Sequence, residues 1–524
     1  MPDFPPIVLA IAFAAVVIAV TAIARRLPVP PPILQVLAGF LVGLVPGVAM
    51  PELRPDIVFF VFLPPVLWAA AFFTSVRDFN ANIRPIGLLA IGLVIATSVA
   101  VAIAARMIFP DMSWPVAIAL GAIVSPPDAV AAAAIVSRLP VPRRVVVVLE
   151  GESLVNDASA LVLYRSAVAA AVTGAFSWGE SIVRFFLDAG VGVLVGILVA
   201  WLVLRLLRVS RDPMAETLLT LAAPFVAWLA AETLHASAVL ACVAGGIYLR
   251  RHFSSAVAPL SRLNNRSVWD LVVFVLNAAI FLMLGMQFRA LLAAVPDRSL
   301  IALLKDGVII ALVAIVVRLV WVPIATVLPR LLSPRVRRAD PMPPWKPVFL
   351  VSWTSMRGIV SLATALALPA TLASGAPFPY RSEIIVITVC VISVTLVVQG
   401  FTLAPLIKAF AFPPDGSHHS ELRVARLEAW RRGAEVLEDL SREPWVDARD
   451  VEWLRGELRD RIRLLEHHSG EPEARRRLRI AMLRAERRMV VRLRNEGAIS
   501  DDTLGVLEHE LDLEAARAGL GEER

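Results

Sequence analysis

The sequence lacks the residues from which disulfide frameworks, metal clusters and soluble surfaces are built. Only 2 of the 524 residues are cysteine. Both Cys242 and Cys390 lie inside apolar runs, so we expect neither a disulfide framework nor a metal cluster. Charged residues make up 18% of the chain and hydrophobic residues 58%, whereas soluble domains have roughly 25% charged residues. This balance excludes an ordinary soluble domain and indicates a membrane protein.

Signals of catalysis and of secretion are also missing. No Ser/His or Cys/His pair falls at membrane depth, where an intramembrane enzyme would need a nucleophile and a base. No helix carries a pair of metal-ligand histidines. The N-terminus MPDFPP has no basic segment, and no small-residue cleavage site follows the first apolar run. We therefore predict a protein that is not an enzyme, that needs no cofactor and that carries no cleaved signal peptide.

Long apolar runs account for most of the chain to about residue 410. A membrane-spanning helix needs about 20 mainly apolar residues. We count thirteen such spans, at roughly 7–24, 33–49, 57–73, 85–108, 115–136, 145–173, 182–207, 215–231, 236–250, 267–288, 300–328, 346–368 and 383–410. Residues 411–524 instead alternate Glu and Arg with Leu and Val at helical spacing, which predicts a helical cytosolic domain. The fold class is therefore an all-α polytopic membrane protein with a helical tail.

Arginine and lysine are distributed unevenly over the loops. On these boundaries the loops of one side carry nineteen of them and those of the other side five, and the richer side is expected to be cytoplasmic. The N-terminus is then outside and the tail inside. Because orientation also explains the net charge of +7, we expect a multi-pass protein of the cell (inner) membrane with no nucleic-acid partner.

Five charged residues lie well inside predicted spans, where isolated charges are costly: Asp128, Glu152, Asp157, Arg318 and Arg357. At about 1.5 Å per residue, all five lie about 10–18 Å from the cytoplasmic end of their span. Opposite charges from distant spans therefore share one layer and can offset each other's desolvation. A static ion-pair network is one explanation. Three acids against two arginines leave one acid without a dedicated partner, which favours a functional site.

Two of the spans are predicted to be broken helices. In the fifth, SPPDA has the pattern of a helix start, with Ser125 as the cap, Pro126 at the first position and Asp128 in the first turn. In the twelfth, Arg357 followed by Gly358 is typical of a helix C-terminus. If spans one to six and eight to thirteen are equivalent halves, these breaks lie at equivalent positions in oppositely directed segments. Paired breaks in two inverted repeats point to the substrate site of a secondary transporter.

The sixth span carries residues that could bind a cation. In LEGESLVNDASALVLY, Ser153 and Asp157 share one helix face, and Glu152 and Asn156 share the neighbouring face. The first face offers the hard oxygen ligands that alkali cations prefer, while Glu152 can turn toward an arginine. A carboxylate that holds either a proton or a cation, but never both, couples the two fluxes. That is the minimum that an antiporter needs.

Three segments resemble the signature segments of the NhaP-type sodium/proton antiporters, in the first family of monovalent cation:proton antiporters. They are GAIVSPPDAVA, EGESLVNDASALVLY and SMRGIVSLA, and they follow one another in the family's order along the membrane portion. The resemblance implies exchange of Na⁺, with Li⁺ and K⁺ as further candidates, for H⁺ across the cell membrane, in the service of pH homeostasis. It also implies alternating access in a homodimer, with core helices at about 85–173 and 300–410 sliding against dimerisation helices at about 7–73 and 182–288.

The resemblance also implies a role for each residue of the motifs. Asp157 would alternately bind the cation and the proton, and Asn156 beside it is associated with electroneutral exchange. The remaining ion-site ligands would be Asp128, Ser153 and the backbone carbonyl of Pro127. Glu152 would pair with Arg318, and Arg357 would balance the charge of the broken twelfth span.

Two departures from the family pattern concern ion affinity. Many relatives have Thr at the position of Pro127, and some have Glu shortly after the Leu-Pro-Pro of the third span, where this chain offers Ala69 and Ala70. The choice among Na⁺, Li⁺ and K⁺ therefore stays open. A different class also stays open, a passive cation channel or an ion-sensing membrane protein that signals through its tail, although nothing resembles a repeated filter loop.

For three charged residues near span ends we expect ordinary positions at the membrane surface. Arg165 is expected to reach the lipid headgroups. Asp270 and Glu216 are expected to be solvated near the cytoplasmic surface, where they could help to attract cations.

Overall fold

The structure is a computed structural model, and it describes residues 6–24, 30–45, 58–136, 139–174, 178–210, 212–293, 300–413, 416–466, 473–496 and 498–517. The ordered elements in these ranges are all helices; no β-strand occurs in them. The chain divides into two units, residues 1–414 and residues 415–524. The boundary coincides with the predicted change from apolar spans to an amphipathic tail.

Helices occupy all thirteen ranges that the apolar runs predict. Nine of the ranges each contain one helix: α1 (Pro6–Ala24), α2 (Pro31–Leu44), α10 (Arg143–Thr173), α11 (Trp178–Val209), α12 (Pro213–Thr233), α13 (Ala238–Ala256), α14 (Pro259–Ala293), α15 (Leu300–Leu332) and α19 (Arg381–Phe410). The third range combines η1 (Val58–Phe62) with α4 (Leu63–Phe73), and the fourth combines α6 (Ile83–Gly87), η2 (Leu88–Leu93) and α7 (Val94–Ile108). Short α5 (Val76–Ala81) and α16 (Pro334–Ala339) lie in loops. Six helices in the described ranges are long and apolar enough to cross a membrane by themselves.

The fifth and twelfth ranges are each split into two short helices. The fifth consists of α8 (Trp114–Val124) and α9 (Ala129–Val136), and the twelfth consists of α17 (Trp345–Trp353) and α18 (Ile359–Leu366). Four and five residues without helical structure separate the members of each pair. These breaks are tolerated at membrane depth only where their backbone faces protein or water.

Close helix packing in the first unit depends on glycine. The helix pairs α2 and α14, and α11 and α13, pack over long stretches. A Cβ on Gly39 of α2 would lie 1.9 Å from the Leu282 carbonyl oxygen of α14, and one on Gly196 of α11 would lie 2.1 Å from the Ala241 carbonyl oxygen of α13. Small residues at such crossings let helix backbones approach, as is usual in membrane bundles.

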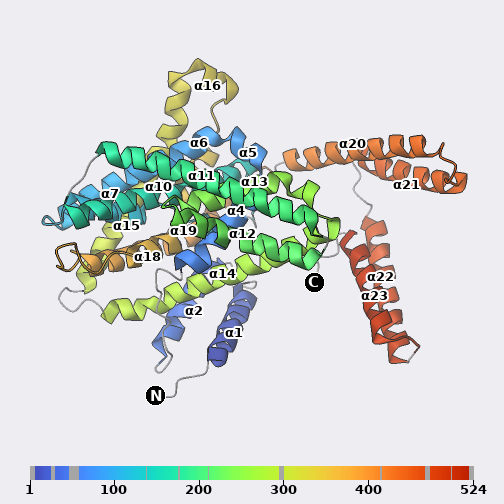
Figure 1. The fold of residues 1–524 in the computed structure, drawn as a ribbon, viewed down its shortest axis with the longest axis horizontal. Coiled ribbons are helices and arrows are strands. Elements are labelled where there is room, and N and C mark those ends of the chain that lie inside the picture. Colours follow the sequence, from blue (N-terminus) through green and yellow to red (C-terminus); the bar gives the residue numbers. More distant parts are fainter. Residues whose placement is uncertain are drawn as a thin grey trace. The chain divides into compact units, whose positions relative to one another are not determined.

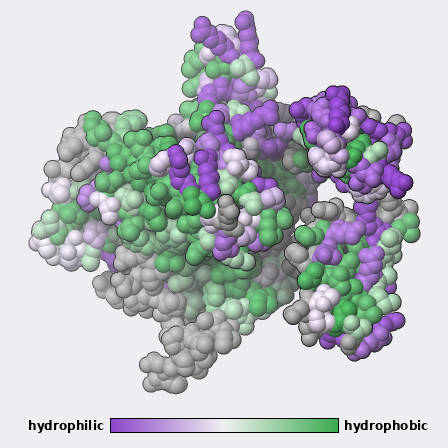
Figure 2. Space-filling model, turned by 45° about the vertical axis from the view of Figure 1, so that its right-hand side comes forward, coloured by the Kyte–Doolittle hydropathy of each residue, from purple (hydrophilic) through white to green (hydrophobic). Residues whose placement is uncertain are grey.

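A second group of helices packs around its own apolar core. Helix α8 packs against α7 and α10, and α15 packs against α7 and α19. Their buried side chains form a cluster that includes Val101, Leu120, Ile310 and Ile387. The long helices of the first unit run in similar directions (Figure 1). Figure 2 shows hydrophobic residues gathered over the flank of this unit and hydrophilic residues on the protruding α16.

The second unit consists of four amphipathic helices in two packed pairs. Helix α20 (Gly416–Leu440) packs against α21 (Ala448–Glu466), and α22 (Glu473–Asn495) packs against α23 (Asp501–Arg517). Exposed Arg–Glu pairs such as Arg455–Glu452, at 2.7 Å, connect neighbouring turns. Such pairs contribute little to stability, so the helices depend mainly on their apolar faces.

Candidate functional site

The two helix breaks meet in the interior of the first unit. The backbone N–H of Asp128, in the first break, donates a hydrogen bond to the carbonyl of Met356, in the second, at 2.7 Å. A Cβ on Gly358 would lie 1.9 Å from the Asp128 carboxylate oxygen Oδ2. Segments separated by more than 220 residues in sequence therefore form one contact, in which each break satisfies part of the other's exposed backbone.

The first break is built differently from the predicted helix start. Ser125 is the C-cap of α8, not the N-cap of α9, and its hydroxyl donates to the Ala122 carbonyl at 3.1 Å. Asp128 directly precedes α9, whose first residue is Ala129. The two prolines explain the difference, because Pro127 disfavours a helical conformation at Pro126, so that the helix restarts only after both.

The second break also departs from the prediction. Helix α17 ends at Trp353, so Arg357 lies within the break and not in the last helical turn. Gly358 has φ −136° and ψ −154°, an extended conformation, and does not form a left-handed turn. The glycine is required there because Asp128 approaches too closely for any side chain.

Polar side chains of α19 hold the second break. The hydroxyl of Thr395 accepts a hydrogen bond from the Arg357 backbone N–H at 3.1 Å, and Oε1 of Gln399 accepts one from the Ser355 N–H at 3.2 Å. Both side chains are fully buried. Neither residue was predicted from the sequence, although a Thr and a Gln four residues apart in an apolar span are a readable signal.

Asn156 connects the first break to α10. Its side-chain amide Nδ2 donates to the Pro127 carbonyl at 3.1 Å, and its Oδ1 is buried without a hydrogen-bond partner in the described part of the chain. Pro127 has no N–H to donate, but the hydrogen bond from Asn156 holds its carbonyl oxygen in a defined position. The amide turns this carbonyl into a fixed element of the site.

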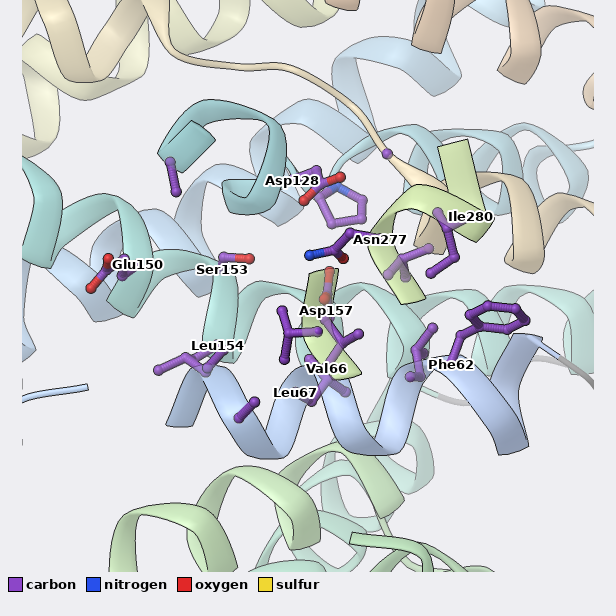
Figure 3. A pocket seen from close by; sticks show the side chains of 18 of the residues that line it. Phe62, Val66, Leu67, Asp128, Glu150, Ser153, Leu154, Asp157, Asn277 and Ile280 are labelled. Carbon is purple, nitrogen blue, oxygen red and sulfur yellow. The ribbon is translucent and has the colours of Figure 1, made fainter. Parts of the chain in front are cut away.

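The carboxylate of Asp157 lies in a cavity of about 310 Å³ that also exposes Asp128, Ser153 and Pro127. Figure 3 shows the side chains of Asp157, Asp128, Ser153 and Asn277 around the same space. Asp157 is 6% exposed, and within the described ranges no side chain or backbone N–H donates a hydrogen bond to its carboxylate. A buried carboxylate is costly unless a partner offsets its charge, so this geometry suits a group that binds a cation or a proton.

Glu152, the residue directly before Ser153 of the cavity, belongs to a buried ion pair. Nη1 and Nη2 of Arg318 donate hydrogen bonds to the two carboxylate oxygens of Glu152, the second at 2.7 Å. Nε of the same guanidinium group donates to the Val351 carbonyl at 3.1 Å. Arg318 is 0% and Glu152 1% exposed. The bidentate geometry and the third bond offset the desolvation of both charges.

Arg357 is the second buried cation near the ion pair. Its side chain is 1% exposed, and Nε and Nη1 have no hydrogen-bond partner in the described ranges. Its charged neighbours are Arg318 and Glu152. The five charged residues that the sequence placed at one depth thus fall into two groups. Asp128 and Asp157 line the cavity, and Glu152, Arg318 and Arg357 form a buried cluster.

The cavity is also lined by polar residues that the sequence patterns did not single out, namely Thr74, Glu150, Asn277 and Ser361. Asn277 of α14 lines it beside Asp157 (Figure 3). A single Asn inside the apolar stretch VFVLNAAIFLML is a signal of the same kind as Asp128. Ala69 and Ala70 line the cavity too, so no carboxylate stands at those two positions.

Three residues near span ends differ partly from expectation. Glu216 is 5% exposed and not solvated, because the start of α12 packs against α14. Arg165 pairs with Glu232 of α12 at 3.2 Å, an ion pair that the expectation did not include. Asp270 is exposed and lines the cavity, with Arg266 at 3.8 Å.

Comparisons with known proteins agree on one family. The family model "Sodium/hydrogen exchanger, transmembrane" matches residues 11–409. An Na⁺/H⁺ exchanger of Mycobacterium tuberculosis is 34% identical, over 97% of this chain and 95% of that protein. A Bacillus pumilus protein named a sodium, potassium, lithium and rubidium/H⁺ antiporter is 34% identical, over 72% of this chain and 58% of that protein.

A solved structure matches the fold as well. The sodium proton antiporter MjNhaP1 of Methanocaldococcus jannaschii superposes with a TM-score of 0.60 at 18% identity, over 76% of this chain and 98% of that one. At this identity the likeness concerns the fold alone.

Proposed function

Since the chain belongs to the sodium/hydrogen exchanger family of membrane antiporters, we propose that it exchanges Na⁺ for H⁺ through the carboxylate of Asp157. The observation that carries this proposal is the environment of that carboxylate. It is buried, it accepts no hydrogen bond from the described residues, and it shares a cavity with Asp128 next to both helix breaks.

The cavity supplies the oxygen ligands that a small alkali cation needs. Asp157 and Asp128 provide carboxylates, Ser153 provides a hydroxyl, and Pro127 provides a carbonyl whose position Asn156 holds. Hard cations prefer such ligands. Asn277 adds an amide from the opposite side of the cavity. When Asp157 is protonated its attraction for a cation disappears, so the two ions exclude each other.

The charges of the site support one-for-one exchange. Loaded with a proton or with Na⁺, the Asp157 carboxylate carries the same net charge of zero. The Glu152–Arg318 pair stays neutral in both forms, and Asn156 is an amide that does not titrate. We therefore infer electroneutral exchange, in which the membrane potential does no work on the loaded site.

Alternating access is supported by the position of the cavity between two groups of helices. One wall comes from α4 and α14, and the other from α10 and the two breaks. We infer that the helices at 85–173 and 300–410 move as a core against those at 7–73 and 182–288, the latter forming the contact of a homodimer. Glu150, Thr74 and Asp270 line the cavity near the helix ends that the loop charges predict to be cytoplasmic, and we infer an inward-open state.

This orientation places the N-terminus outside the cell membrane and residues 411–524 in the cytoplasm, in a chain with thirteen spans in two inverted halves. The pairing of α8/α9 with α17/α18 supports the inverted halves, because each half then contains one broken helix. Exchange of this kind serves the control of internal pH. The name of the Bacillus pumilus relative includes potassium, lithium and rubidium, so these cations are candidate substrates alongside sodium.

The proposal is tested with purified protein in vesicles that carry an imposed pH gradient. Addition of Na⁺ should release protons in the wild type and not in Asp157→Asn. The matched control is Asp270→Asn, an acid-to-amide change at the rim of the same cavity, which should keep most of the activity. Equal signals from wild type and Asp157→Asn would reject the mechanism, and Na⁺ current without proton release would indicate a channel. Repeating the measurement with Li⁺ and K⁺ defines the selectivity.

A further inference from the structure

A second cavity, distinct from the ion site, opens at one end of the first unit. It has a volume of about 600 Å³ and shares no lining residue with the cavity of Asp157. It lies among the ends of α6, α10, α15, α17 and α19, which the loop charges predict to be cytoplasmic. We refer to it as the basic groove.

The rim of the basic groove is strongly cationic. It carries Arg84, Arg144, Arg330 and Lys346. One carboxylate, that of Asp340, accepts hydrogen bonds from all three arginines, at 2.5, 2.9 and 2.6 Å respectively. Four cationic groups against this carboxylate leave an excess of three positive charges.

Part of this charge is accessible from the groove. Arg84 and Arg144 are 32% and 45% exposed, whereas Arg330 is 4% exposed. Lys346 directs its ammonium group to the Phe410 carbonyl at 2.9 Å and keeps further donors. Arg84, Arg144 and Lys346 are therefore the groups that an anion would meet.

The walls of the basic groove are apolar and not suited to a free anion. They include Leu89, Val148, Val322, Phe410 and Phe412, and a proline-rich segment closes one side at residues 341–344. The prolines contribute no N–H donors. A cationic rim over apolar walls matches a molecule with an anionic head and a hydrocarbon tail.

We propose that the basic groove binds one anionic phospholipid of the cytoplasmic leaflet. The phosphate would lie against Arg84, Arg144 and Lys346, because guanidinium groups match the geometry of phosphate oxygens. An acyl chain would occupy the apolar part. Basic pockets between membrane helices on the cytoplasmic side are suited to such headgroups.

The position of the groove connects the lipid to the transport site. Val351 lines the groove, and its carbonyl accepts the bond from Nε of Arg318, which pairs with Glu152. A bound lipid would therefore stabilise the helix end that supports the buried ion pair. This inference concerns ligand binding, and its test does not depend on any transported ion.

The test compares full-length protein in vesicles of phosphatidylcholine with and without phosphatidylglycerol. Wild type should retain one phosphatidylglycerol per protomer through mild detergent extraction, as measured by native mass spectrometry, and should melt at a higher temperature with it. Arg144→Gln/Lys346→Gln should weaken retention by about fivefold for each cation removed. The control Arg335→Gln/Arg337→Gln removes two exposed arginines of α16, outside the groove, and should retain the lipid.

A second variant keeps every charge. Ala325→Trp fills the groove and should also lose the lipid, which guards against an effect of misfolding in the charge variant. Inorganic phosphate and glycerol phosphate should not raise the melting temperature, because they lack the acyl chain. Stabilisation by these soluble anions alone, or equal lipid retention by wild type and both groove variants, would overturn the proposal.

Labelling of Ala325→Cys by a maleimide distinguishes the lipid from the chain's own tail as the occupant. The two native cysteines are buried, so the introduced thiol dominates the signal. Phosphatidylglycerol should slow labelling several-fold relative to phosphatidylcholine alone. Equally slow labelling in both membranes would show that protein fills the groove and would overturn the lipid assignment.

Discussion

The side-chain amide of Asn156 donates a hydrogen bond to the backbone carbonyl of Pro127 across 3.1 Å. The contact joins the sixth predicted span to the break of the fifth. It holds a carbonyl that lies in the helix break and belongs to neither α8 nor α9. The proposed ligand carbonyl of Pro127 therefore depends for its position on a hydrogen bond from Asn156.

Loss of this bond should weaken cation binding. Asn156→Ala removes a contribution of about 1 kcal/mol and frees the carbonyl, so the apparent KM for Na⁺ should rise about five- to tenfold with a smaller change in maximal rate. The measurement is Na⁺-dependent proton release in vesicles. The control is Ser159→Ala, which removes a hydroxyl one turn away whose bond is to its own helix. An unchanged KM for Na⁺ in Asn156→Ala would show that this hydrogen bond does not support cation binding.

The glycine of the second break should tolerate no side chain. In Gly358→Ala the new methyl group would meet the Asp128 carboxylate at 1.9 Å, and Asp128 or the break must shift. We expect transport to fall by more than tenfold in protein that still inserts into membranes. Gly87→Ala is the matched control, because a Cβ there has nothing within 4 Å. Normal transport by Gly358→Ala would contradict the close contact of the two breaks.

The buried ion pair should show strong coupling. Glu152→Gln or Arg318→Met alone leaves one unpartnered charge and should cost about 3–5 kcal/mol of stability. The double variant should be closer to wild type than either single variant. Glu452→Gln and Arg455→Met in the exposed pair of the tail provide the comparison, with an expected coupling below about 1 kcal/mol. Thermal melting in detergent measures all of these, and additive effects in the buried pair would refute the coupling.

The ion pair between Arg165 of α10 and Glu232 of α12 provides a test of alternating access. The two helices belong to the proposed core and dimerisation groups, and the side chains meet at 3.2 Å. Cross-linking of Arg165→Cys/Glu232→Cys with a bifunctional maleimide of matching length should abolish transport, because the groups could no longer slide. Each single cysteine variant, treated with the same reagent, should keep its activity. Full transport by the cross-linked protein would show that transport does not require relative motion of α10 and α12.

The carboxylate of Asp340 should contribute stability that depends on pH. Burial raises its pKa, but hydrogen bonds from Arg144 and Arg330 outweigh this effect and hold the pKa below its ordinary value. A depressed pKa in the folded state means that the contribution is complete above the unfolded value of about 3.9 and is lost as the pH falls through the folded value. The melting temperature of Asp340→Asn should therefore be lower than that of wild type above about pH 5 and converge with it toward lower pH. A difference in melting temperature that grows on acidification would contradict a depressed pKa for Asp340.

Much of the architecture follows from local sequence patterns. Apolar length predicts helices in all thirteen ranges that contain them, because a chain in lipid must satisfy its backbone within each segment. The membership of the exchanger family, indicated by SPPDA, ESLVND and MRG, is confirmed by the match over residues 11–409. The depth of Glu152 and Arg318 in their spans placed them in one layer, and the family resemblance implied that they pair; the structure contains this ion pair.

The local form of the breaks required the tertiary structure. Ser125 and Gly358 have residue types that suit helix ends, yet Ser125 closes the preceding helix and Gly358 makes room for Asp128. Propensity describes a residue's freedom along its own chain. The two prolines after Ser125 decide its role locally, whereas Gly358 is fixed by Asp128, a residue more than 220 positions away. The same holds for Asn277, Thr395 and Gln399, which are ordinary polar residues until the packing places them at the cavity or the break.

The sequence by itself determined the membrane class, the helical ranges, the family and the set of charged residues at one depth, because hydropathy and residue type act over neighbouring positions. Only the tertiary structure decided which groups face one another: Asp157 open to a cavity, Glu152 closed onto Arg318, and three arginines gathered on Asp340. Charge interactions depend on distance and on the exclusion of water, and both arise only when distant helices pack together.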